Sequence, residues 1–195
     1  MSDDRKHRVC PVERAGVLDL NFRKLLQNPR KILEPYVKEG MQALDLGCGP
    51  GFFTLEMARL VGRSGRVTAV DLQQGMLDIL RKKLAGSELA GRVKFNLSRS
   101  EGTGLAERFD FILVFYMLHE VPDQARFLAE VRSLLKPGGK VLLAEPKWHV
   151  SHEEFLAAIA VMERAGFAVL ERPKIHFSRV VLIGPAGARE AAGGS

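Results

Sequence analysis

Short apolar runs alternate with amphipathic stretches from Gln42 onward, and this alternation limits the folds open to the chain more than any other feature. Runs this apolar are typical of parallel strands covered on both faces. Five of them are predicted as strands: Ala43–Leu46, Arg66–Val70, Val93–Leu97, Phe109–Phe115 and Lys140–Ala144. Three intervening stretches carry apolar residues at helical spacing: Met76, Leu80 and Leu84; Phe127, Val131 and Leu135; Phe155, Ile159 and Met162. Regular alternation of this kind predicts right-handed βαβ crossovers and a doubly wound, Rossmann-like α/β fold.

Two further apolar runs follow Gly166, at Phe167–Leu170 and Arg179–Gly184, and they are separated by Arg172-Pro173-Lys174. The Pro-containing segment predicts a turn between two closing strands. The sequence therefore predicts a seven-stranded sheet, mostly parallel with an antiparallel last strand.

The two ends of the chain differ in texture from its middle. Residues 1–39 are predicted as a helical leader, with helix-like spacing in Val17–Leu26 and Arg30–Val37 broken at Asn28-Pro29. Residues 40–184 form the predicted ligand-binding domain, and residues 185–195, rich in Ala and Gly, form a predicted disordered tail. Because no long insertion follows the fourth or fifth strand, we expect the leader to act as a lid over the pocket. A helix that only packs on the sheet edge is the alternative.

Composition bounds the cellular setting and the partners. No apolar stretch is long enough for a signal peptide or a membrane span, which favours a cytoplasmic protein. Only Cys10 and Cys48 are present, too few for a disulfide framework. Lys and Arg exceed Asp and Glu by 29 to 23. We interpret the excess Lys and Arg residues as belonging to a solvated helical face. The alternative is that they attract an anionic substrate or nucleic acid.

A glycine-rich turn, Leu44-Asp45-Leu46-Gly47-Cys48-Gly49-Pro50-Gly51-Phe52, joins the first predicted strand to its helix. Such a turn lets a ligand lie against bare backbone, and Asp71, at the end of the second strand, stands where an acid binds ribose hydroxyls. A dinucleotide site would need its third glycine where Phe52 stands. Asp45 would repel a pyrophosphate but suits a ligand with a charged amino group.

From Gln42 to about Glu145 the chain resembles the class I S-adenosylmethionine (SAM)-dependent methyltransferases. Asp45 and the three glycines of the turn match the family's first motif, and Asp71 matches its ribose-binding acid. Phe109-Asp110-Phe111-Ile112-Leu113 matches its fourth strand and Leu135-Lys136-Pro137-Gly138-Gly139-Lys140 the turn before its fifth. Leu118-His119-Glu120-Val121-Pro122-Asp123 is similar to the small-molecule subgroup, which includes the ubiquinone/menaquinone methyltransferases.

The resemblance implies SAM as the cofactor and S-adenosylhomocysteine as its product. The residues it implies for cofactor binding are Asp45, Gly47, Cys48, Gly49, Gly51, Phe52, Asp71, Leu72, Ser100, Glu101, Val114 and Phe115. Taken singly, Gly49 could be only a turn glycine and Cys48 only a small packing residue. The segment 98–102 departs from the family's Gly-Asp-Ala pattern, so the adenine contact is left open among residues 98–101.

Tyr116, His119 and Glu145 are the candidate catalytic residues, since ligands of doubly wound sheets bind outside the carboxyl ends of strands. Tyr116 either lines the methyl-transfer face or packs. His119 is either a general base or a hydrogen-bonded bystander. A metal site could use His119, Glu120, Glu145 and His149 as its ligands. Their mixed spacing matches no metal template, so no metal is predicted.

The predicted function is methyl transfer to a small-molecule acceptor by in-line displacement. The basic leader and the pI near 9.5 favour a nucleic-acid or protein methyltransferase as an alternative. Against it, the segment Phe115-Tyr116-Met117-Leu118 lacks the Asn/Asp-Pro-Pro-Tyr box of amino-methylating nucleic-acid enzymes. A second alternative is a non-catalytic SAM-binding subunit. The sequence leaves the acceptor and the oligomeric state open.

Overall fold

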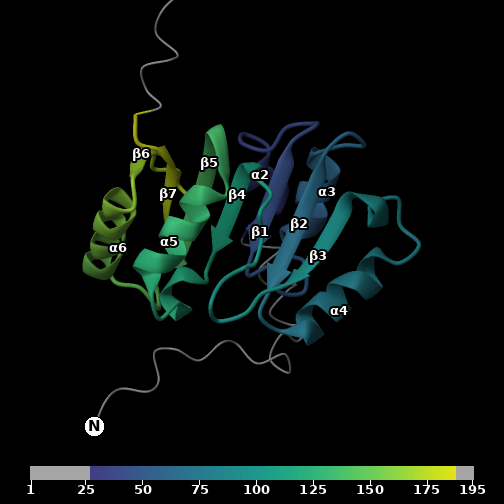
Figure 1. The fold of residues 1–195 in the computed structure, drawn as a ribbon, viewed down its shortest axis with the longest axis horizontal. Coiled ribbons are helices and arrows are strands. Elements are labelled where there is room, and N and C mark those ends of the chain that lie inside the picture. Colours follow the sequence, from purple (N-terminus) through teal and green to yellow (C-terminus); the bar gives the residue numbers. More distant parts are fainter. Residues whose placement is uncertain (1–26, 188–195) are drawn as a thin grey trace, which may run out of the picture. The chain divides into compact units, whose positions relative to one another are not determined.

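The computed structural model describes residues 27–187, which fall into two compact units, 27–105 and 106–187. Its seven strands have the order β3-β2-β1-β4-β5-β7-β6 (Figure 1). Strands β1, β2 and β3 are parallel to one another, β4 and β5 are parallel, and β7 runs against both of its neighbours, β5 and β6. The prediction of a doubly wound, mostly parallel sheet with an antiparallel last strand is confirmed.

The unit 27–105 contains a parallel three-stranded part of the sheet with its connecting helices. Its elements are α2 (Pro29–Leu33), β1 (Gln42–Leu46), α3 (Thr54–Leu60), β2 (Arg66–Asp71), α4 (Gln74–Leu84), the 3₁₀ helix η2 (Ala90–Arg92) and β3 (Val93–Leu97). Strand β2 pairs with β1 on one side and with β3 on the other. Met76, Leu80 and Leu84 of α4 are all buried, as the helical spacing predicted.

Helix α2 is shorter than the predicted segment 30–37. The side chain of Asn28 accepts a hydrogen bond from the backbone N–H of Lys31 at 3.2 Å, and Pro29 occupies the first turn, where its missing N–H costs nothing. The helix ends at Leu33, and residues 34–36 form turns. Val17–Leu26 and residues 188–195 of the predicted tail 185–195 lie outside the described residues, whereas Pro185 of that tail belongs to β7 and pairs with Phe167.

The unit 106–187 contains the remaining four strands. Its elements are β4 (Phe109–Phe115), the 3₁₀ helix η3 (Leu118–Glu120), α5 (Gln124–Ser133), β5 (Leu135–Pro146), α6 (His152–Arg164), β6 (Phe167–Glu171) and β7 (Ser178–Pro185). Strands β4 and β5 are parallel, and β7 lies antiparallel between β5 and β6. In α6, Phe155, Ile159 and Met162 are buried as predicted.

Strand β5 begins five residues earlier than the sequence predicted. Phe109 pairs with Leu135, and the next paired residue, Phe111, faces Lys140, so the expected turn is a bulge inside the strand pairing. A side chain at Gly139 would place its Cβ 2.8 Å from the Phe109 carbonyl oxygen. The glycine therefore lets the bulged backbone lie against β4.

The helix after β4 begins at Gln124. Asp123 accepts a hydrogen bond from the backbone N–H of Arg126 at 3.0 Å and caps this helix, α5. His119 and Glu120 belong to the separate 3₁₀ helix η3. Val131 is buried as predicted, whereas Phe127 is only half-buried and Leu128 takes its place in the core. Leu135, predicted as a helical core residue, belongs to β5.

Candidate functional site

The glycine turn after β1 is anchored to the end of β2. The backbone N–H groups of Gly47 and Cys48 both donate to the carbonyl oxygen of Val70, at 2.9 Å each. Gly51 donates to the carbonyl oxygen of Cys48 at 3.0 Å and closes the turn. These bonds fix the loop backbone next to Asp71.

Gly49 and Gly51 are required for different reasons. Both have a positive φ, +51° and +88°, in the left-handed region that favours glycine. A Cβ at Gly51 would lie 2.2 Å from Leu80 Cδ1, so the absence of a side chain there allows α4 to pack. A Cβ at Gly49 would have no atom within 4 Å. The backbone at Gly49 therefore faces open space, which is the setting a bound ligand needs.

Asp71 links the glycine turn to the segment after β2. Its Oδ2 accepts the backbone N–H of Gly49 at 2.8 Å and its Oδ1 accepts that of Gln73 at 2.9 Å. Burial raises the pKa of Asp71, and the hydrogen bonds from Gln73 and Gly49 oppose the increase. The backbone of Leu72 also hydrogen-bonds to this carboxyl group, and because a carboxylate has about four acceptor sites, Asp71 can still accept a hydrogen bond from a ligand hydroxyl. The next residue, Leu72, is 47% exposed.

Asp45 is buried in β1, two residues before the first glycine of the turn. Its Oδ2 accepts a hydrogen bond of 2.6 Å from the hydroxyl of Thr54, the first residue of α3. Burial raises the pKa of Asp45 to about 7; the Thr54 bond lowers it and the charge of Asp71 adds to the increase. Near neutral pH the carboxyl group is divided between its neutral and ionised forms, and a cation beside it would favour the ionised form.

Cys48 and Phe52 are packed residues of the turn. Burial and the charges of Asp45 and Asp71 raise the pKa of the Cys48 thiol, so it stays protonated at neutral pH. The half-buried Phe52 ring meets Phe53 edge to face, with centroids 4.9 Å apart.

Ser100 and Glu101 form the exposed tip of a tight turn after β3. Arg99 and Gly102 exchange two backbone hydrogen bonds of 3.1 Å, and the Ser100 hydroxyl donates to the Glu101 carboxylate at 2.7 Å. Ser98 N–H donates to the carbonyl oxygen of Asp71 at 3.0 Å, which fixes the start of this turn beside the acid.

In the unit 106–187, Val114 and Phe115 are buried in β4, and the next residue, Tyr116, has a left-handed backbone with φ +61°. Such a conformation costs a non-glycine residue about 1–2 kcal/mol. The Tyr116 hydroxyl lies 2.5 Å from Ser178 Oγ, whose own proton goes to the carbonyl oxygen of His176 at 3.1 Å. The Tyr116 hydroxyl is therefore the donor to Ser178.

The ring of Tyr116 lies in an aromatic group at the ends of β4 and β5. Its centroid is 4.4 Å from that of Phe115 and 5.6 Å from that of Trp148, which it meets edge to face. Trp148 is 64% exposed. Since Ser178 begins β7 and pairs with Pro146 of β5, the bond from Tyr116 to Ser178 reaches across the end of β5.

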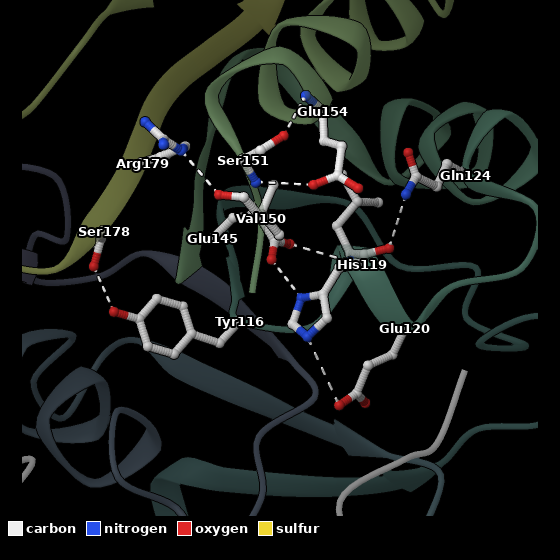
Figure 2. Close-up of polar contacts among 11 residues, drawn as sticks. Tyr116, His119, Glu120, Gln124, Glu145, Val150, Ser151, Glu154, Ser178 and Arg179 are labelled. Carbon is white, nitrogen blue, oxygen red and sulfur yellow. Dashed lines mark hydrogen bonds and ion pairs between the residues drawn. The ribbon is translucent and has the colours of Figure 1, made fainter. Parts of the chain in front are cut away.

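His119 and Glu145 form a close polar pair in this unit (Figure 2). His119 Nδ1 is 2.5 Å from Glu145 Oε2, and the His119 backbone N–H donates to Oε1 at 3.3 Å. On the other side of the ring, His119 Nε2 is 4.0 Å from Glu120 Oε1. The His119 ring stacks on that of His149 with centroids 5.5 Å apart. Of the three catalytic candidates, the structure bonds His119 to Glu145, whereas Tyr116 bonds to Ser178.

Burial opposes protonation of His119, but the hydrogen bond and charge of Glu145, followed by the charge of Glu120, outweigh it and raise its pKa. Within residues 27–187, no three His, Cys, Asp or Glu side chains are placed to hold a metal ion. In the same residues, no helix combines the length and the apolar character needed to span a membrane.

The sequence did not indicate Thr54 or Ser178 as partners of site residues. Thr54 lies nine residues after Asp45 at a helix start, and Ser178 lies 62 residues after Tyr116 on the antiparallel strand. A short hydroxyl at a helix start could have identified Thr54. Neither spacing nor periodicity could have identified Ser178, because its position depends on how β7 pairs with β5.

The family model for the methyltransferase domain matches residues 37–171. A ubiquinone/menaquinone biosynthesis C-methyltransferase of Marinomonas sp. is 36% identical over 110 residues, covering 56% of this chain and 44% of that protein. A demethylmenaquinone methyltransferase of Lactobacillus johnsonii is 38% identical over 112 residues, covering 56% and 45%. The chain thus aligns with somewhat less than half the length of these relatives.

Among solved structures, a SAM-dependent methyltransferase from Aquifex aeolicus has a TM-score of 0.77 and 25% identity, with 90% of this chain and 100% of that chain covered. A TehB-like SAM-dependent methyltransferase from Corynebacterium glutamicum has a TM-score of 0.72 and 15% identity, with 89% and 97% covered. The second likeness shows the fold alone.

Proposed function

The chain belongs to the methyltransferase domain family, and from this premise we propose that it transfers the methyl group of SAM to a small-molecule acceptor. The predicted methyltransferase is confirmed at the level of the family. The relatives named above, a ubiquinone/menaquinone biosynthesis C-methyltransferase and a demethylmenaquinone methyltransferase, support a small acceptor.

The observation that carries the proposal is the bond from Gly49 N–H to Asp71 Oδ2, at 2.8 Å. It joins a glycine of the turn to a buried acid, so backbone without a side chain and a carboxylate lie next to each other. A nucleoside needs both features, a surface that its sugar can approach closely and an acceptor for its two hydroxyl groups.

The described residues fit SAM as the group bound there. Asp71 would accept the ribose hydroxyls, Leu72 would cover the ribose and adenine, and the backbone of Gly47 and Gly49 would lie along the ligand. Asp45, whose pKa is raised by burial and would be lowered by a cation beside it, would interact with the amino group of the ligand. SAM supplies an activated methyl group on a sulfonium, and the chain's residues bind and orient it.

The remaining predicted cofactor residues have more indirect roles in this proposal. Gly51 acts by letting Leu80 pack, and Cys48 and Phe52 shape the turn from within. Ser100 and Glu101 are proposed as adenine neighbours because Ser98 is bonded to Asp71. Val114 and Phe115 are proposed as backbone neighbours of the sulfonium. The cytoplasmic location and the lid formed by residues 1–39 also remain proposals.

Isothermal titration with S-adenosylhomocysteine and, separately, with NAD⁺ tests the proposal. We expect saturable binding of S-adenosylhomocysteine and none of NAD⁺, since Asp45 and Phe52 stand where a dinucleotide site needs a neutral residue and a glycine. Binding of NAD⁺ alone, or of neither ligand, would overturn the proposal.

A further inference from the structure

Glu145 holds His119 through two contacts, one to the ring and one to the backbone. Oε2 lies 2.5 Å from Nδ1 and Oε1 lies 3.3 Å from the backbone nitrogen of the same residue. The Glu145 side chain is 2% exposed. A buried carboxylate that accepts both donors of one residue fixes the position and the rotation of its imidazole ring.

This contact also selects the tautomer of the ring. An ionised carboxylate has only acceptor sites, so Nδ1 must carry the proton that lies between it and Oε2. In the neutral imidazole the other nitrogen, Nε2, is then a free base. Figure 2 shows Nε2 on the side of the ring away from Glu145 and directed toward Glu120.

The surroundings of Nε2 suit proton transfer to and from solvent. The side chains of His119 and Glu120 are 22% and 25% exposed, and Nε2 and Glu120 Oε1 are 4.0 Å apart. His149 stacks on the His119 ring, with centroids 5.5 Å apart, and is a third titratable side chain beside it. A proton on Nε2 thus has a nearby carboxylate that is in contact with water.

Tyr116, which was also a candidate catalytic residue, is arranged differently from His119. Its hydroxyl donates to Ser178 Oγ, and Ser178 donates onward to the His176 carbonyl oxygen. This chain of bonds runs away from His119 and fixes the Tyr116 ring as an aromatic surface. The hydrogen bonds therefore favour His119 as a base and Tyr116 as a packing residue.

We infer that His119 is the catalytic base of the methyl transfer, that Glu145 is its positioning residue, and that Glu120 receives the proton from Nε2. The inference rests on the proposed function. It assigns the acceptor to the compounds whose reacting oxygen, nitrogen or carbon carries a removable proton, such as phenols and enols. Thioethers and other acceptors without such a proton need no base, so His119 and Glu145 would have no role in their methylation.

The transfer balances with these residues. The acceptor atom forms its bond to the methyl carbon while the electron pair of the broken C–S bond stays on sulfur. The acceptor's proton moves to Nε2, which gives an imidazolium that Glu145 stabilises. Glu120 then takes the proton and releases it to water, which returns His119 to its starting form. The raised pKa of His119 agrees with a base that is stabilised in its protonated state.

Imidazole ¹⁵N NMR tests the positioning directly, with the His119 signals assigned by their loss in His119→Gln. In the wild-type protein we expect the neutral ring to be the Nδ1–H tautomer. In Glu145→Gln the His119 pKa should fall and both tautomers should appear. In Glu120→Gln, which leaves the Nδ1 contact intact, the pKa should fall while the tautomer stays unchanged.

His149→Ala is the matched control, since it removes the stacked ring but neither carboxylate, and the Nδ1–H tautomer should persist. An Nε2–H tautomer in the wild-type protein, or an unchanged tautomer in Glu145→Gln, would overturn the positioning role. Should Glu145→Gln not fold, Glu120→Gln decides the proton route, because an unchanged His119 pKa there would contradict it.

Methyl transfer to 1,4-naphthohydroquinone, catechol and acetylacetone tests the base. We expect His119→Gln to lower kcat roughly 100-fold or more for the probe that is methylated, and His149→Ala to leave it within a few fold. An equally fast His119→Gln variant would overturn the base, and a protein that methylates none of the three probes would overturn the acceptor class. S-adenosylhomocysteine titrated into the same samples separates these failures from failure of the proposed function, which would appear as no binding.

Discussion

The backbone N–H of Gly49 donates to Oδ2 of Asp71 at 2.8 Å, which joins two residues 22 positions apart in the sequence. Gly49 supplies backbone that a ligand can approach closely, and Asp71 supplies a buried hydrogen-bond acceptor. Because the bond holds both in place before any ligand is bound, little ordering cost is left for the binding step.

The two glycines of the turn give a matched pair of variants. Gly49→Ala adds a side chain in open space at positive φ, so we expect a loss of stability of about 1–2 kcal/mol and at least a tenfold loss of S-adenosylhomocysteine affinity. Gly51→Ala adds the clash with Leu80, so its loss of stability should be larger, about 3 kcal/mol or more. Urea unfolding and titration calorimetry measure both. Wild-type affinity in Gly49→Ala would show that this glycine serves the turn only.

Asp45→Asn tests the buried carboxyl group. Its folded-state pKa of about 7 lies above the unfolded value, so the folded protein binds the proton more tightly. Stability from this group is therefore present below about pH 4 and is lost as the pH rises from about 4 to about 7. Relative to Asp45→Asn, the wild-type protein should lose roughly 2–4 kcal/mol over this interval. The control is Asp78→Asn, which changes an acid on the solvent-facing side of α4. Parallel pH curves for wild type and Asp45→Asn would contradict the assignment.

Ligand affinity should depend on pH through the same residue. If the amino group of the ligand lies near Asp45, it favours the ionised carboxylate, and S-adenosylhomocysteine should bind more tightly as the pH rises from 6 to 8. Calorimetry in buffers of different ionisation enthalpy should then detect proton release near pH 7. In Asp45→Asn both the pH dependence and the proton release should disappear. Their persistence would assign the effect to another group.

Tyr116→Phe tests the bond across the end of β5. Removal of the hydroxyl should reduce stability by about 0.5–1.5 kcal/mol, since it takes away the donor to Ser178. Ser178→Ala should cost a similar amount, and the double variant should cost less than the sum of the two. A double-mutant cycle by urea unfolding measures this coupling. Additive losses would mean that the two hydroxyls do not interact.

Much of the fold, and the position of the glycine turn beside Asp71, could be predicted because the signals are local. The apolar runs predicted the strands, and the place of Asp71 at the end of the second apolar run predicted an acid at the end of β2. The bulge at Gly139 and the cap at Asp123 were missed, since each depends on how the chain meets a neighbouring element. The same holds for the partner of Tyr116. Its bond to Ser178 exists only because β7 pairs antiparallel with β5, and no local pattern near residue 116 carries that information.

The central claim is that Asp71 binds the ribose of the methyl donor, and Asp71→Ala tests it most directly. The matched control is Asp78→Ala, which removes an exposed acid of α4 that is paired with Arg81. In titration calorimetry with S-adenosylhomocysteine, we expect Asp71→Ala to bind at least tenfold more weakly than wild type, since charge-assisted hydrogen bonds contribute about 1.5–3 kcal/mol. Asp78→Ala should bind as wild type does. Equal affinity of Asp71→Ala and wild type would contradict the account.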